Sequence, residues 1–182
     1  MAIYRTGQGA VLGRLPGTEA YRDVRLHPGA LTFPGLLIWR TGGELFFASI
    51  GHVDAGLKAA LAASRPQVRH VLVDVESVNF IDTSACDALL NSIKELQSQG
   101  ITFAFARVRD EVRERMRLAG IEAVVGSTNF HERVTDGVHA WQESKEKQAA
   151  IEDCHALIGV ARSRPMSPLG SGEIRTSTQV LS

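Results

Sequence analysis

The residues best suited to chemistry in this sequence are two hydroxyls, Thr83 and Ser84, within the segment NFIDTSACDALL at residues 79–90. A run of β-type residues ends at Asp82, and the periodicity of a helix begins directly after it. Hydroxyls at such a junction allow three interpretations: a helix cap, a catalytic nucleophile, or a site that a partner modifies or binds. One Asp, Ser or Thr suffices for a cap, and three capping-type residues in succession exceed that need.

A catalytic nucleophile is the least supported of the three interpretations. Ser84 lacks the G-x-S-x-G elbow, and no motif marks any of the six histidines as its general base. His131 and His139 have no third ligand in a metal-binding pattern. The sequence contains no G-x-x-x-x-G-K-[ST] loop, and GQGAVLG at residues 7–13 misses the dinucleotide fingerprint by one position. We therefore expect no catalytic residues, no metal ligands, no required cofactor and no enzymatic activity.

A phosphate on Ser84 or Thr83 would experience two opposing effects. The N-terminus of the helix favours negative charge, whereas Asp82 and Asp87 repel it. We expect such a phosphate to alter the local surface without unfolding the domain, which is the behaviour of a switch.

Composition limits the wider possibilities. The 182 residues are 44% hydrophobic and 22% charged, which is ordinary for a globular chain. Twenty Lys+Arg balance twenty Asp+Glu, so a broad basic face for nucleic acid is not expected. The sequence contains no apolar run of the roughly 20 residues that cross a bilayer, and no apolar segment at the N-terminus predicts secretion. Cys86 and Cys154 lie far apart, which favours a reduced, cytoplasmic compartment.

Alternating patterns predict an α/β domain whose sheet has a parallel core. Strands are expected at 10–15, 70–78, 101–108 and 123–128, with a β-hairpin formed by 36–41 and 44–49 around Gly42-Gly43. Helices are expected after Gly51, after Asp82, over 109–120 and around Val134, the last running on through 142–159. The Ser-, Pro- and Gly-rich residues beyond Gly159 predict a disordered tail.

The region 107–117 is rich in arginine: it contains Arg107, Arg109, Arg113, Arg115 and Arg117. Glu111 and Arg115 have the i,i+4 order that supports a helix. We interpret the region as a solvated charged face in preference to an anion or lipid-headgroup contact.

Several segments together resemble a STAS domain, the module shared by sulfate transporters and anti-sigma factor antagonists. The resemblance rests on FIDTSACDALLNSIKELQSQGI between two strands, followed by VRDEVRERMRLAGI. VLGRLPGTEAYRDV at 11–24 and FPGLLIWRTGGELFFAS at 33–49 are similar, more specifically, to the cytoplasmic C-terminal domain of SulP-family anion transporters. The resemblance implies a single α/β domain, a STAS-like mixed β-sheet with surrounding α-helices, at residues 10–145. Residues 1–9 would be an N-terminal extension, and 146–182 a C-terminal extension that is helical and then disordered.

The same resemblance assigns roles at the junction. In anti-sigma factor antagonists a D-S-[ST]-G motif carries the phosphorylated hydroxyl at its third position, which is Ser84 here, with Asp82 and Thr83 before it. Ala85 stands where those relatives have glycine, which predicts hindered approach of a kinase and no phosphorylation. The family also implies GTP or ATP as a weak ligand at Asp82, Thr83, Ser84, Ala85 and Cys86, with the N–H groups of Ser84 to Cys86 as donors.

The function implied is a non-catalytic regulatory domain of a sulfate-type transporter, on the cytoplasmic face of the membrane. Because LGRLPGTEAYRD follows the last membrane helix in SulP proteins, we expect a fragment of a longer transporter. Expected partners are the transmembrane transport domain of that transporter, which this chain does not contain, a second protomer, and a regulatory protein or kinase. Nucleic acid is not expected as a partner. The alternative is a free-standing anti-sigma factor antagonist switched by phosphorylation at Ser84.

Overall fold

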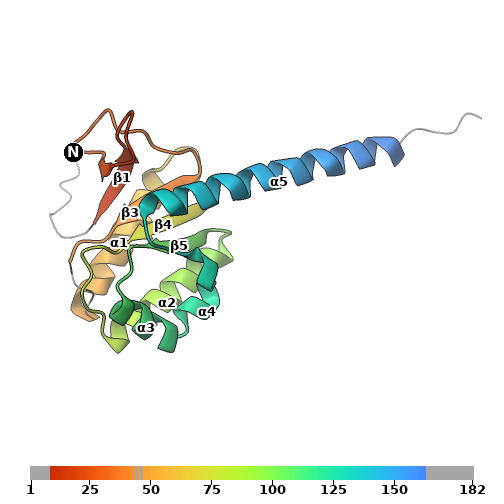
Figure 1. Ribbon diagram of the computed structural model, residues 1–182. Helices are drawn as coiled ribbons and strands as arrows, with labels where there is room; N and C mark the ends of the chain where they lie inside the picture. The colour runs from red at the N-terminus through yellow and green to blue at the C-terminus, as the bar shows by residue number, and fades with distance from the viewer. Residues whose placement is uncertain (1–8, 44, 46, 163–182) are drawn as a thin grey trace, which may run out of the picture. The chain divides into compact units, whose positions relative to one another are not determined.

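Six strands form one mixed sheet in the order β2-β1-β3-β4-β5-β6 in a computed structural model, which describes residues 9–43, 45 and 47–162 (Figure 1). Neighbours from β3 to β6 are parallel, whereas β1 is antiparallel to both β2 and β3. This arrangement confirms the predicted mixed sheet with a parallel core. The strands are β1 (Ala10–Arg14), β2 (Tyr21–Asp23), β3 (Leu36–Arg40), β4 (His70–Asp74), β5 (Thr102–Ala106) and β6 (Phe130–His131).

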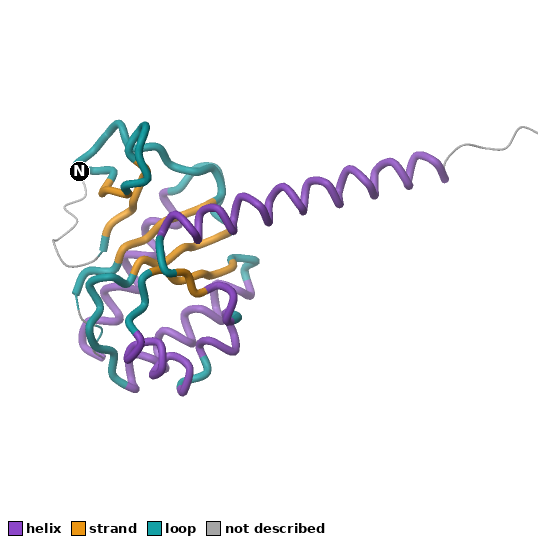
Figure 2. Tube along the Cα trace, in the orientation of Figure 1, coloured by secondary structure: helices purple, strands orange, loops and turns teal. Residues whose placement is uncertain are grey.

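Helices cover both faces of the sheet in the unit Met1–Glu143, as Figure 2 shows. One face packs against α1 (Phe47–Ala63), α2 (Thr83–Ser98), α3 (Asp110–Leu118) and α4 (Ile121–Val125). The first turns of α5 (Val134–Arg162) cover the other face. A 3-10 turn, η1 (Ser127–Asn129), precedes β6.

Strand β4 illustrates why the sheet is covered on both sides. Val71 and Val73 belong to the cluster that contains the buried residues of α2, whereas Leu72 lies in the cluster with Val134 and Val138. Since successive side chains of a strand point to opposite faces, a continuous apolar run needs cover on both.

The predicted hairpin after β3 is wrong. Residues 47–49 belong to α1, and Leu45 forms a single parallel bridge with Ile81. Both edges of β3 are already paired, one with β1 and the other with β4, so β3 has no free edge for a hairpin partner. Glu44 and Phe46, which also fall in that prediction, lie outside the described residues.

The strand expected at 123–128 is also wrong. Residues up to Val125 belong to α4, whose Ile121 and Val125 are both buried one helical turn apart. The strand itself comes later, as β6. The sequence pattern did not predict β2, a three-residue strand at the edge of the sheet.

The second unit, Ser144–Ser182, is described as far as Arg162, where α5 ends. The side chains from Ser144 to Glu152 are exposed, including Ile151 at 51%. The predicted disordered tail begins too early, because residues 160–162 still belong to α5; its remainder, residues 163–182, and most of the N-terminal extension lie outside the described residues. In the described ranges, every helix is too short or too polar to cross a membrane.

Candidate functional site at the junction before α2

The backbone that leads into α2 is fixed by the segment around Leu45. Ile81 is fully buried and forms its bridge with Leu45. The Leu45 N–H donates to the Phe80 carbonyl at 3.2 Å, and the Asp82 N–H donates to the Leu45 carbonyl at 3.3 Å. The residues just before the two hydroxyls are therefore held in place by the sheet.

Asp82 is the N-cap of α2. Its Oδ1 accepts a hydrogen bond from the Ala85 N–H at 2.6 Å, and its extended backbone (φ −86°, ψ 166°) is typical of that position. The capping interpretation therefore explains Asp82, while the hydroxyls of Thr83 and Ser84 are not needed for it.

Thr83 and Ser84 are both exposed at the start of α2. Within the part of the chain that the structure describes, neither side chain is hydrogen-bonded to a base that could activate it. The described part of the chain also contains no group of three or more His, Cys, Asp or Glu side chains that could hold a metal ion. The arrangement exposes two hydroxyls at the surface.

The Ala85 side chain does not lie on this exposed surface. Ala85 is fully buried, so its methyl group packs in the core beneath the junction. The steric reason for expecting no phosphorylation is thereby removed, and Ser84 stays a candidate for phosphorylation.

The N-terminus of α2 offers less to an anion than the sequence suggested. Of the three expected donors, the Ala85 N–H is bonded to the Asp82 carboxylate and the Cys86 N–H to the Asp82 carbonyl at 3.0 Å. Only the Ser84 N–H has no acceptor among the described residues. The expected set of three donors is therefore wrong, because the chain's own carboxylate occupies the position that a phosphate would take.

The Cys86 thiol is unsuited to nucleophilic chemistry. Burial raises the pKa of Cys86, Asp87 and Asp82 raise it further, and only Arg115 opposes them. Since the thiolate is the reactive form, a buried neutral thiol at this position is a core residue.

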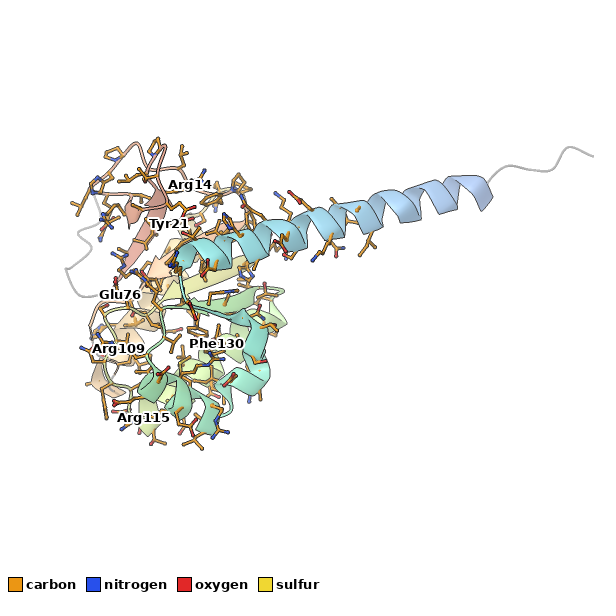
Figure 3. The ribbon with its side chains drawn as sticks, in the orientation of Figure 1. Arg14, Tyr21, Glu76, Arg109, Arg115 and Phe130 are labelled. Atoms are coloured by element: carbon orange, nitrogen blue, oxygen red, sulfur yellow. The ribbon has the colours of Figure 1, made fainter. Side chains whose placement is uncertain are left out.

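Arg115, labelled on α3 in Figure 3, contacts the same junction. Its Nη1 donates to the Ile81 carbonyl at 3.0 Å, and its guanidinium lies 4.2 Å from the centre of the Phe80 ring. Glu111 and Arg115 both lie in α3, so the predicted helix is present, although no ion pair joins them among the described residues. The interpretation of 107–117 as a solvated charged face holds for Arg109, Arg115 and Arg117, which are exposed, whereas Arg107 and Arg113 are partly buried.

A buried carboxylate at the end of β4 was missed entirely. Asp74 is 0% exposed and accepts hydrogen bonds from Arg40 Nε at 2.7 Å and from Arg107 Nη2 at 2.6 Å and Nε at 3.0 Å. The Glu76 N–H adds a bond at 3.3 Å, and the Glu76 carboxylate lies 2.6 Å from Arg107 Nη1. Arg107 adopts a left-handed backbone with φ 59°, which is uncommon for a residue other than glycine.

A sequence signal for this cluster existed. Arg40, Asp74 and Arg107 come at or just after the carboxyl ends of β3, β4 and β5, three neighbouring parallel strands. One charged residue at the end of each of three buried strands predicts that they meet at one edge of the sheet.

The structure is a small α/β domain with two exposed hydroxyls at a strand-to-helix junction. A family profile described as the STAS domain matches residues 27–137. The chain belongs to the STAS domain family.

Its relatives include sulfate transporters of plants and bacteria. It is 30% identical over 153 residues to the "Probable sulfate transporter 4.2" of Arabidopsis thaliana, covering 79% of this chain and 23% of that protein. The "Low affinity sulfate transporter 3" of Stylosanthes hamata is 32% identical over 150 residues, which cover 77% of this chain and 23% of that protein. The chain thus spans about a quarter of the length of these relatives.

Solved structures share the fold at low sequence identity. The murine Slc26a9 anion transporter superposes with a TM-score of 0.69 at 16% identity, over 76% of this chain and 23% of that one. The SulP transporter STAS domain from Vibrio cholerae gives 0.55 at 18% identity, over 68% of this chain and 94% of that domain. The anti-sigma factor antagonist SpoIIAA, in its unphosphorylated form, gives 0.50 at 15% identity, over 62% and 93%.

Proposed function

We propose that this chain is the cytoplasmic regulatory domain of a SulP-type transporter for sulfate or a related inorganic anion. The observation that carries the proposal is the similarity to sulfate transporters over 79% of the chain, in a region that makes up only 23% of the relative. A module of this size attached to a transporter and lacking an evident catalytic group suits regulation or assembly. The transport domain is its expected partner.

The exposed pair Thr83 and Ser84 is the surface through which we propose that control is exerted. The backbone before the pair is fixed by Leu45, and Asp82 caps α2 without the hydroxyls. A new negative charge on Ser84 would therefore change what a partner meets and leave the cap in place.

Sulfate uptake by the transporter that carries this chain provides the test. Ser84→Asp should change uptake and leave the melting temperature of the isolated chain nearly unchanged, because an acidic residue in the first turn suits the helix dipole. Ser127→Asp, at another exposed serine that begins a different short helix, should change neither. If uptake and stability fall together, the hydroxyl is structural, and if neither responds, this junction is not the regulatory surface.

The alternative function is an anti-sigma factor antagonist switched at Ser84. Two observations favour keeping it: the exposed hydroxyl and the burial of the Ala85 methyl group away from that surface. Incubation with a cognate anti-sigma kinase and ATP should add one phosphate by intact mass, and Ser84→Ala should abolish the addition. DNA upstream of Met1 separates the two functions: an open frame with about ten hydrophobic segments supports the transporter, and a stop codon beside a kinase gene supports the antagonist.

Weak GTP or ATP binding at residues 82–86 remains a prediction. Of the three expected donors only the Ser84 N–H is uncommitted among the described residues, which supports only low affinity. Nucleotide-dependent shifts in the amide spectrum of these residues would measure it.

A further inference from the structure

A second strand-to-helix junction, at the start of α5, has the opposite electrostatic character. Its cavity of about 250 Å³ is lined by residues of β2, the ends of β3 and β5, and the first turn of α5. Four of the lining side chains are arginines: Arg22, Arg40, Arg107 and Arg133. Glu19 is the one carboxylate among the described residues that line it.

Two of these arginines are held in position from behind. Arg40 and Arg107 share the buried Asp74, which does not line the cavity, and their side chains keep 29% and 27% exposure. Guanidiniums fixed in this way need little further ordering when a ligand arrives. Arg107 also pairs with Glu76, so Arg40 and Arg107 together are balanced by two carboxylates, and the excess positive charge comes from the other two arginines.

Among the described residues, the other two arginines have no carboxylate partner. In the described ranges, Arg22 donates only to the neighbouring Tyr21 carbonyl at 3.1 Å, and the Arg133 side chain forms no ion pair. Both are exposed at the cavity. Asp136, in the first turn of α5, accepts a hydrogen bond at its Oδ2 from the Arg133 N–H at 3.1 Å.

The backbone at this helix end adds uncommitted donors. Arg133 directly precedes α5, and a guanidinium cannot accept hydrogen bonds, so it cannot cap the helix as Asp82 caps α2. No acceptor within the described part of the chain is bonded to the N–H groups of Val134 and Thr135, which both line the cavity. Tyr21, labelled in Figure 3, also lines it, and burial raises the pKa of its phenol, so the hydroxyl remains a donor.

We propose that this arginine pocket, formed by Arg22, Arg40, Arg107 and Arg133, binds a tetrahedral oxyanion, either free sulfate or phosphate or the phosphate of a lipid headgroup. Planar guanidiniums match the paired oxygens of such anions, and a helix N-terminus favours their charge. The volume suits a small anion with some of its water and lies below that typical of drug-sized ligands. Binding is a property of the chain by itself, so its failure would leave the proposed regulatory role untouched.

Titration of the full chain with sodium sulfate and with sodium phosphate, against sodium chloride at equal ionic strength, tests the proposal. Amide signals of Arg133, Val134 and Thr135 should shift saturably. Arg22→Gln and Arg133→Gln should each weaken binding by about tenfold or more, since each removes charge-assisted hydrogen bonds. These two are chosen because Arg40 and Arg107 also hold Asp74.

Arg65→Gln is the matched control, because Arg65 is an exposed arginine outside the pocket that likewise donates only to backbone carbonyls. It should bind as the unaltered chain does. A parallel arm uses phosphatidylcholine vesicles with and without phosphatidylinositol 4,5-bisphosphate. Binding of the free anions assigns the pocket to them, and arginine-dependent binding of the phosphoinositide vesicles alone assigns it to a headgroup. Binding that is absent in both arms, or equal in the Arg22, Arg133 and Arg65 variants, would overturn the proposal.

Discussion

Replacing Asp74 tests whether the buried ion cluster stabilises the domain. Asp74→Ala removes three guanidinium hydrogen bonds and one backbone bond from a fully buried carboxylate. Breaking a buried pair typically costs about 3–5 kcal/mol, because the remaining charges lose their partner. Here Arg40 and Arg107 are 29% and 27% exposed and can regain some water, so we expect the lower end, about 3 kcal/mol.

Urea unfolding followed by far-UV circular dichroism measures this loss. With a slope of about 2 kcal/mol per molar, the midpoint should fall by roughly 1.5 M. Arg40→Ala should shift the midpoint less, because Asp74 then retains both of its bonds to Arg107. Should Asp74→Ala fail to fold, Asp74→Asn keeps the shape and removes the charge, and it should lie between the two.

Glu114→Ala is the matched control. It breaks the ion pair between Glu114 and Arg117. Both side chains are about half exposed, and exposed pairs contribute little to stability. Its midpoint should match that of the unaltered chain. A loss in Asp74→Ala no larger than in Glu114→Ala would refute the reasoning, because burial would then make no difference to the cluster.

Two further predictions concern packing and pH. Although alanine favours helices, Gly137→Ala should destabilise the domain by about 1–2 kcal/mol, because the added Cβ would lie 2.7 Å from Cδ1 of the buried Leu72. Gly51→Ala has open space around the added Cβ and should stabilise the domain by about 0.5–1 kcal/mol. Thermal melts of the two variants test this difference. Burial lowers the pKa of His70 from 6.5 to about 4, and His131 adds to the effect. As the pH falls, His70 is therefore protonated in the unfolded chain before it is protonated in the folded one. The free energy of unfolding should decrease as the pH drops from about 6.5 to 4. The free energy of unfolding should depend less on pH across that range in His70→Gln, and an unchanged dependence would contradict the lowered pKa of His70.

The parts of the fold that could be predicted are those where one pattern dominates locally. The stripe of Cys86, Ile93 and Leu96 determines the buried face of α2, and Gly100, with φ 80°, ends it as expected. The prediction failed at Leu45 because pairing depends on which strand edges remain free. β3 has two partners distant in sequence, and no pattern within residues 36–49 records them.

The sequence predicted the location of the junction before α2, but it did not predict how the charged and hydrogen-bonding groups there are arranged. The capping-type residues correctly indicated a helix start at Asp82, but they could not show that Asp82 would take the Ala85 N–H and leave both hydroxyls outside. Asp74 was hidden for a different reason. Its neighbours Arg40 and Arg107 are 34 and 33 residues away and meet it where three parallel strands end. The strand predicted at 70–78 ran past Asp74, so the position of Asp74 at a strand end was not recognised.

The two helix starts at the carboxyl ends of the parallel strands are chemically complementary. The start of α2 is capped by a carboxylate and exposes hydroxyls, whereas the start of α5 follows an arginine and adjoins three more. Their buried faces belong to different clusters, one on each side of the sheet. A phosphate on Ser84 would add negative charge beside Asp82, where the helix end already has its anion, so its effect should be repulsive and outward. An oxyanion at the start of α5 would instead neutralise a positive surface. Each event would therefore make its own face of the domain more negative.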